Sequence, residues 1–214
     1  MRTRKLAGCF GITMVALLVG GARQAEAVIV FDNFGPGDTF SGATSEVTLG
    51  TFERADGFII PNFEVTLDTI ELPLSRSGPG PNALNVFLAT NAADMTPADV
   101  VEAFLVTGLP ECCPSAPALS IINSSFHPAL AANTKYWLVV DSTDPETSGF
   151  WHFNSIGDVG PAGLRLNLGD WSTTDNGNRH AFRIIGTVVP EPSSFFLLGS
   201  GLLGLAGWRR SRPC

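Results

Sequence analysis

The sequence predicts an all-β protein built on a single domain of β-sandwich or jelly-roll type over residues 28–189. First, apolar and aromatic residues occur in short runs that suit strands better than helices. Second, turn-forming residues separate nearly all of these runs, as at 35–37 and 77–81. Third, apolar and polar residues alternate in runs such as 84–88, which indicates one buried and one wet face. Regularly spaced short strands of this kind are typical of sandwiches and jelly rolls.

The predicted strands follow one another along the chain, and no internal repeat is present. One helical turn is expected at Thr96, because Pro97 would take its first helical position. A turn is expected at residues 175–178, which are rich in Asn and Gly. The predicted strands cover residues 28–31, 57–60, 63–67, 70–72, 84–88, 101–106, 135–140, 149–153 and 181–188.

The amino terminus predicts a signal peptide over residues 1–27. Basic residues precede an apolar run over 6–21, and Ala25 and Ala27 supply the small-x-small pattern of a cleavage site. The mature chain is therefore expected to begin at Val28. A permanent membrane helix is the alternative, and the shortness of the apolar run argues against it.

The carboxyl terminus predicts a membrane-inserted tail over residues 190–214. Pro190, Glu191 and Pro192 are followed by an apolar segment over 193–208. At about 1.5 Å per helical residue this segment spans about 24 Å, which is short of the roughly 30 Å hydrocarbon core. Because the prolines keep a helix from extending upstream, the segment is expected to form a short membrane helix.

A basic cluster over 209–214 completes the tail, since Arg209, Arg210 and Arg212 follow the apolar segment. Arginines at the end of a membrane helix hold that end on the cytoplasmic side. The order of Pro-Glu-Pro motif, helix and basic tail over residues 190–212 resembles the bacterial PEP-CTERM sorting signal, which exosortase-type proteases recognise. An ordinary tail anchor or a buried C-terminal helix is the alternative, but a core helix is rarely apolar on every side.

Removing both ends leaves a strongly acidic domain. The whole chain has 13 Lys and Arg against 20 Asp and Glu. Residues 28–192 keep six of the basic and nineteen of the acidic residues, a net charge of about −13. Binding to nucleic acid or to anionic lipid requires Lys and Arg to neutralise phosphates, so nucleic acid is not an expected partner. The charge suits a solvated envelope protein.

A second resemblance rests on the order of the predicted strands. This order resembles the choice-of-anchor group of secreted β-domains, with type R as the nearest subgroup. The segments that carry the resemblance are, in order, residues 31–34, 57–70, 85–88 and 133–140. Those domains have interchangeable surface-sorting tails. The resemblance implies a β-sandwich at an envelope or matrix and no known catalytic activity, and it transfers no catalytic residue to this chain.

The histidines give no sign of catalysis. His127, His152 and His180 are the only ones in the chain, and none lies in a zinc-binding motif or beside a nucleophile motif. Strand alternation places His152 opposite Trp151 and Phe153, as a solvent-facing or hydrogen-bonded structural residue. No enzymatic activity, cofactor or metal is therefore expected.

A cluster of acidic residues and a pair of adjacent cysteines each have a structural and a functional interpretation. Asp141, Asp144 and Glu146 are close in sequence, but their segment is typical of a polar turn and departs from the spacing of a calcium loop. The adjacent Cys112 and Cys113 can close a small strained ring, pair with other molecules or stay reduced. We expect the cysteine pair to be a loop feature without a redox function.

Aromatic residues offer one weak candidate for sugar stacking. Trp171 follows the polar segment 167–170 and is expected to be exposed, where it can stack on a ligand or anchor its loop. Tyr136 and Trp137 alternate onto opposite faces of a strand, so one of them is expected in the core.

These features predict a non-enzymatic, exported protein, and the resemblance to PEP-CTERM proteins implies a Gram-negative bacterium, a biofilm setting and sorting to the cell envelope, outer surface or extracellular matrix. Its expected partners are signal peptidase, an exosortase-type protease and the extracellular polysaccharide of a biofilm. Before processing, the chain is expected to be inserted in the inner membrane. A cell-surface carbohydrate-binding module is the first alternative. A glycan-active hydrolase, which needs two carboxylates facing each other across a cleft, is the second.

Overall fold

The computed structural model describes residues 26–112 and 119–189, and within these ranges the chain forms strands and no helix. This part of the chain therefore contains no helix capable of crossing a membrane. The strands are β1 (Ala27–Asp32), β2 (Phe40–Thr48), β3 (Phe52–Ile59), β4 (Val65–Ser77), β5 (Ala83–Asn91), β6 (Pro97–Thr107), β7 (Leu119–Asn123), β8 (Ala129–Leu130), β9 (Lys135–Ser142), β10 (Ser148–Asn154), β11 (Val159–Leu166), β12 (Trp171–Asn178) and β13 (Arg183–Val188).

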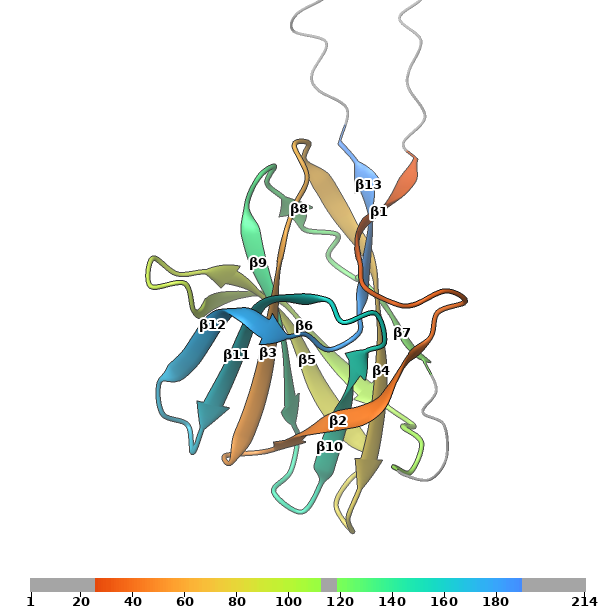
Figure 1. Ribbon diagram of the computed structural model, residues 1–214, viewed down its shortest axis with the longest axis vertical. Helices are drawn as coiled ribbons and strands as arrows, with labels where there is room; N and C mark the ends of the chain where they lie inside the picture. Colours follow the sequence, from red (N-terminus) through yellow and green to blue (C-terminus); the bar gives the residue numbers. More distant parts are fainter. Residues whose placement is uncertain (1–25, 113–118, 190–214) are drawn as a thin grey trace, which may run out of the picture.

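The strands pair into one strongly curled antiparallel sheet in the order β1-β13-β4-β10-β2-β3-β9-β5-β6 (Figure 1). Strand β3 meets β2 at a single residue pair, and it also pairs with β11, which forms a hairpin with β12. The short strands β7 and β8 pair with β4. The all-β prediction is confirmed. The pairing does not distinguish a sandwich from a jelly roll, so that finer assignment stays a prediction.

Strand β4 joins the two halves of the curl and contains a bulge. Its first part pairs with β13 and its last residues pair with β10. The register with β13 shifts near Asp68, because Thr69 pairs with Ile185 and Leu67 with Gly186. Such a bulge inserts one extra residue and changes the alternation. The runs 63–67 and 70–72, predicted as separate strands, therefore belong largely to one strand whose apolar residues all face the core.

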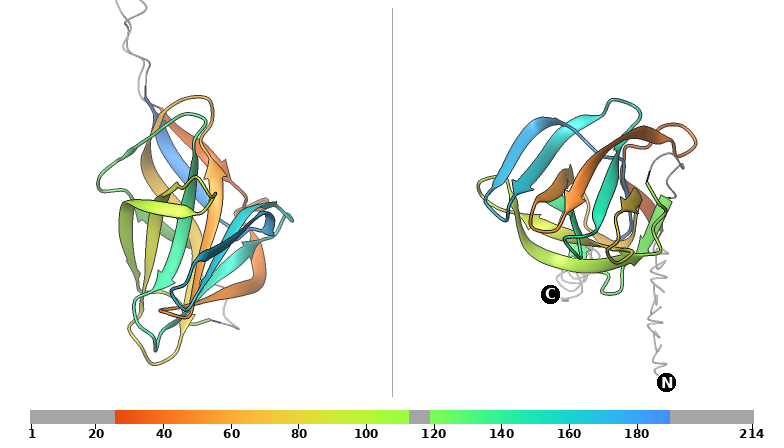
Figure 2. Two further views of the ribbon diagram at one scale, coloured as in Figure 1. Left: turned by 90° about the vertical axis from the view of Figure 1, so that its left-hand side faces the viewer. Right: turned by 90° about the horizontal axis from the view of Figure 1, so that it is seen from below.

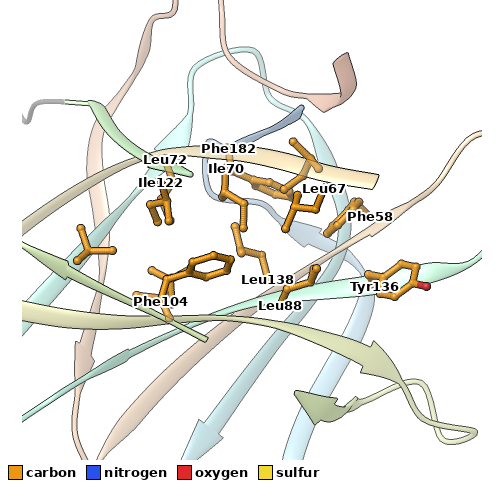
Figure 3. Close-up of a cluster of buried hydrophobic side chains, with 14 of the residues drawn as sticks. Phe58, Leu67, Ile70, Leu72, Leu88, Phe104, Ile122, Tyr136, Leu138 and Phe182 are labelled. Atoms are coloured by element: carbon orange, nitrogen blue, oxygen red, sulfur yellow. The ribbon is translucent and has the colours of Figure 1, made fainter. Parts of the chain in front are cut away.

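The main core lies inside the curl, between β4 and β13 on one side and β3, β5 and β9 on the other (Figure 3). Leu67, Ile70 and Leu72 of β4 point towards Leu88 and Leu138, and all five are fully buried. Burying one such side chain contributes about 1.5 to 3 kcal/mol. Leu84, Val86 and Leu88 join this core, as the alternation over residues 84–88 predicted. The other face of that strand was predicted to be wet and is not, because Phe87 packs against a second cluster.

A second, smaller cluster covers the opposite face of β3, β5 and β9. Ala55, Ala89, Trp137 and Val139 form it. Trp137 is fully buried, its Nε1 donates to Asn91 Oδ1 at 2.9 Å, and Tyr136 belongs to the main core. The two aromatic residues lie on opposite faces as predicted, but both are buried. The sheet thus buries side chains on both faces here, which alternation alone did not indicate.

The helical turn predicted at Thr96 is wrong. Strand β6 begins at Pro97, which pairs with Asn91 of β5. Proline lacks an N–H, but it is tolerated as the first residue of a strand at a sheet edge, and β6 ends the strand order. Asp94 forms the preceding turn, since its carboxylate accepts hydrogen bonds from the Thr96 backbone and hydroxyl.

The turn predicted at residues 175–178 is also wrong, because β12 continues through Asn178. Gly177 pairs with Gly160 of β11. A Cβ atom at Gly177 would lie 2.4 Å from Ala162 Cβ, so the glycine serves close packing within a strand. The polar strands β2 and β12 and the short strands β7 and β8 had no apolar alternation to reveal them.

The two ends of the described chain lie side by side. Strands β1 and β13 are paired, with Ala27 opposite Thr187 (Figure 1). The backbone N–H of Val189 donates to Glu64 O at 3.0 Å, so the chain is held to the sheet up to that residue. The predicted signal peptide body, membrane helix and basic tail lie outside the described residues.

Candidate functional site

The residues predicted for sorting fall mostly outside the described ranges. This holds for Ala25 and for the tail residues, which are Pro190, Glu191, Pro192, Arg209, Arg210 and Arg212. Ala27 is exposed and is the first residue of β1. Cleavage after Ala27 would leave residues 28–32 of that strand intact. Cys112 is disulfide-bonded, and Cys113 lies outside the described residues.

Trp171 begins β12 and does not lie in a loop. Its side chain is partly buried and packs against the second cluster, and the Arg165 guanidinium lies 5.1 Å from the ring centroid. A cation over the ring is a stabilising contact in itself. Stacking of a sugar on Trp171 stays a prediction, and Arg165 would have to share the ring with the ligand.

Next to this tryptophan, two carboxylates are buried side by side. In the strand pairing, Arg165 of β11 lies opposite Trp171 of β12 and opposite Glu53 of β3. Strands β3 and β9 are antiparallel with Arg54 opposite Val140, so the preceding Glu53 lies beside the following Asp141. Arg165 donates to Glu53 Oε2, whereas Glu53 Oε1 has no hydrogen-bond partner within residues 26–112 and 119–189. Burial and the nearby Glu53 raise the pKa of Asp141 to about 6.

Glu53 and Asp141 lie on the adjacent strands β3 and β9, and Glu53 is engaged by Arg165. The neighbouring segment forms the predicted polar turn, in which Asp144 Oδ1 accepts the Glu146 N–H at 2.8 Å. Among the described residues, no group of three or more His, Cys, Asp or Glu side chains could hold a metal ion.

A second histidine, His180, lies between the rings of Trp151 and Phe153. The ring of His180 stacks on both, with centroid distances of 4.4 Å and 4.5 Å. Its Nδ1 lies 2.7 Å from Asp56 Oδ2, and its backbone N–H donates to the same oxygen at 2.6 Å. Because a carboxylate only accepts hydrogen bonds, Nδ1 holds a proton. His180 Nε2 is buried and has no hydrogen-bond partner in the part of the chain that the structure describes.

His152 was predicted to be either solvent-facing or a hydrogen-bonded structural residue, and it is buried and hydrogen-bonded. Its Nε2 lies 3.1 Å from Ser75 Oγ, and its Nδ1 lies 3.2 Å from Ser41 O. Burial lowers the pKa of His152, because the charged ring would lose water. Both nitrogens have protein partners, so this histidine is a structural residue.

His180 borders a pocket of about 410 Å³ that is open to solvent. The hairpin of β11 and β12 curls round towards β2 and β10 and forms one wall (Figure 2, right). The volume falls in the range of ordinary ligand sites, roughly 300 to 1,000 Å³. The polar side chains that line it are Ser45, Arg54, Ser172, Thr173, Thr174, Asn178 and His180, together with the ring of Phe153.

A buried polar network holds His180 in this place. Asn33 Nδ2 donates to His180 O at 2.8 Å, and Asn33 Oδ1 accepts the Phe182 N–H at 2.8 Å. Arg179 forms two hydrogen bonds of 2.8 Å to Asp158. The segment that crosses from β12 to β13 is thereby fixed on both sides of the histidine, so the pocket wall is preorganised.

The sequence did not reveal this site. Asp56 and His180 are 124 residues apart, and the only sign in the sequence was a histidine directly ahead of the predicted strand at 181–188. Arg54 and Asp56 lie in β3, ahead of the predicted strand at 57–60. Antiparallel pairing of β3 with β11, and of β11 with β12, brings these residues together.

The comparisons with known proteins concern the end of the chain. Residues 188–211 match the PEP-CTERM protein-sorting motif. No curated protein shows significant similarity to the chain. The matched segment begins at Val188, the last residue of β13, so the motif starts where the sheet ends. The match supports an exosortase substrate, a protein of a Gram-negative bacterium that is exported to the cell envelope.

Proposed function

We propose that this chain is a non-enzymatic surface protein whose β-domain is sorted by an exosortase and released into the extracellular matrix. The sorting motif at 188–211 is the observation that carries the proposal. The domain's net charge of about −13 supports a solvated location, because excess charge of one sign opposes association. Signal peptidase and matrix polysaccharide complete the set of proposed partners.

The position of the domain's ends also supports the proposal. Ala27 and Thr187 are paired on adjacent strands, so both predicted membrane segments attach to the same end of the sheet. A domain held in this way can be inserted by its two ends and released at that end without disturbing the core. Val189 is the last described residue and is bound to the sheet, and the predicted cleavage motif at 190–192 follows it directly in the sequence.

The test of sorting is the mass of the native protein. Processing should leave a mature chain that begins at Val28 and ends near Pro190, Glu191 and Pro192. Intact-mass spectrometry of the protein recovered from the envelope or medium measures both ends. Retention of Arg210 in the mature protein would contradict removal of the tail.

A basic-tail variant tests how the tail is held. Replacing Arg209, Arg210 and Arg212 with Ser should release unsorted protein with its tail attached, because each arginine costs about 2.5 to 3.5 kcal/mol to move to the membrane centre. The control replaces Arg54 and Arg76, which lie in strands β3 and β4 of the domain and not in the tail. If both variants are sorted like the parent, the basic cluster has no part in sorting.

A further inference from the structure

We propose that the pocket beside His180 binds one uronate, a monosaccharide that has a carboxylate as well as hydroxyl groups. The carboxylate would pair with Arg54, and ring hydroxyls would hydrogen-bond His180 Nε2 and the serines and threonines of β12. This inference goes beyond the proposed sorting function, because it assigns the domain a ligand that sorting does not require.

The first observation is the state of Arg54. Of the six Lys and Arg residues in 28–189, the other five form ion pairs within the described part of the chain. Arg54 lines the pocket, and its one hydrogen bond in this part of the chain runs from Nε to Glu46 O at 3.3 Å. In a domain with such an excess of acid, an arginine without an ion pair is available for an external carboxylate.

The second observation is His180 Nε2. The side chain is 5% exposed, and among the described residues Nε2 has no hydrogen-bond partner, although the ring lies between two aromatic rings. A buried polar atom without a partner is unfavourable unless a water or ligand satisfies it. The residue lines the pocket, so a ligand hydroxyl is a suitable partner. Asp56 holds the opposite nitrogen, which fixes the ring orientation.

The third observation is the wall contributed by β12. Ser172 and Thr174 line the pocket and are exposed, and Ser45 of β2 adds a further hydroxyl. Within the described ranges, no acidic side chain lines the pocket. Asp56 lies close to Arg54 but directs Oδ2 to two N–H groups of His180, which offsets part of its charge. Hydroxyl and amide groups around one cation suit a hydroxylated anion better than a simple carboxylate.

Titration calorimetry of the full chain in detergent, at low salt, tests the proposal. The probes are glucuronate, galacturonate, glucose and acetate. At least one uronate should bind ten times more tightly than glucose and acetate. Absence of any uronate binding up to about 50 mM, or equal binding of glucose, would overturn the proposal.

Variants locate the binding site. Arg54→Gln should remove the preference for uronate over glucose, whereas the control Arg76→Gln should keep it. Ser172→Val alters an exposed wall residue without disturbing the core, and it should weaken uronate binding several-fold. Uronate binding that survives both Arg54→Gln and Ser172→Val would place the ligand elsewhere. Sorting of Arg54→Gln is measured in parallel, and it should be normal, so failure of ligand binding and failure of sorting are separate results.

Discussion

The core around β4 and the hairpin of β11 and β12 are both antiparallel sheet, but they are held together differently. In the core, fully buried leucines and isoleucines meet inside the curl. In the hairpin, the residues of β12 are mostly polar and exposed, and backbone pairing with β11 holds them. The apolar half gives the domain its stability, whereas the polar half is free to present side chains to a ligand.

The largest difference should appear on truncation of a core residue. Leu88→Ala removes a fully buried side chain from the main core. It should lower the free energy of unfolding by about 2 to 5 kcal/mol, because both burial and packing are lost. Leu168→Ala is the control, since Leu168 is 64% exposed between β11 and β12. Urea denaturation measures both, and a comparable loss for the two variants would remove the distinction between the halves.

A glycine in the hairpin tests whether close backbone packing holds the polar half. Gly177→Ala should destabilise the domain by about 1 to 3 kcal/mol, because the added methyl would lie 2.4 Å from Ala162 Cβ. Gly42→Ala is the matched control, since a Cβ there meets nothing within 4 Å. Thermal unfolding followed by circular dichroism measures both. Equal melting temperatures would show that the hairpin adjusts freely.

The buried carboxylates sharpen the comparison through pH. Since the folded-state pKa of Asp141 is raised to about 6, its ionisation opposes folding, and this penalty develops as pH rises from about 4 to 6. Asp141→Asn should therefore stabilise the protein by about 1 to 2 kcal/mol at pH 7.5 and have little effect near pH 4. Asp170→Asn is the control, because Asp170 is exposed. A gain of the same size at both pH values would contradict this prediction, because it could not come from the ionisation of Asp141.

Much of the fold was accessible from the sequence. Runs such as 84–88 and 135–140 alternate or cluster apolar residues because each strand has a face in the core, and these runs became β5 and β9. The match at residues 188–211 agrees with the tail predicted from the Pro-Glu-Pro motif, apolar segment and basic cluster. Such local patterns reflect interactions within a few residues, which is why the sequence by itself could determine them.

Only the tertiary structure decided the rest. Three features depend on which strands become neighbours, and the hydrophobic pattern alone does not specify the neighbours. They are the bulge near Asp68, the strand that begins at Trp171 and the burial of Trp137. The pocket depends on the same choice, because His180 meets Asp56 across 124 residues of chain. Polar strands pair through backbone groups that every residue possesses, so their side chains left no pattern for the sequence to reveal.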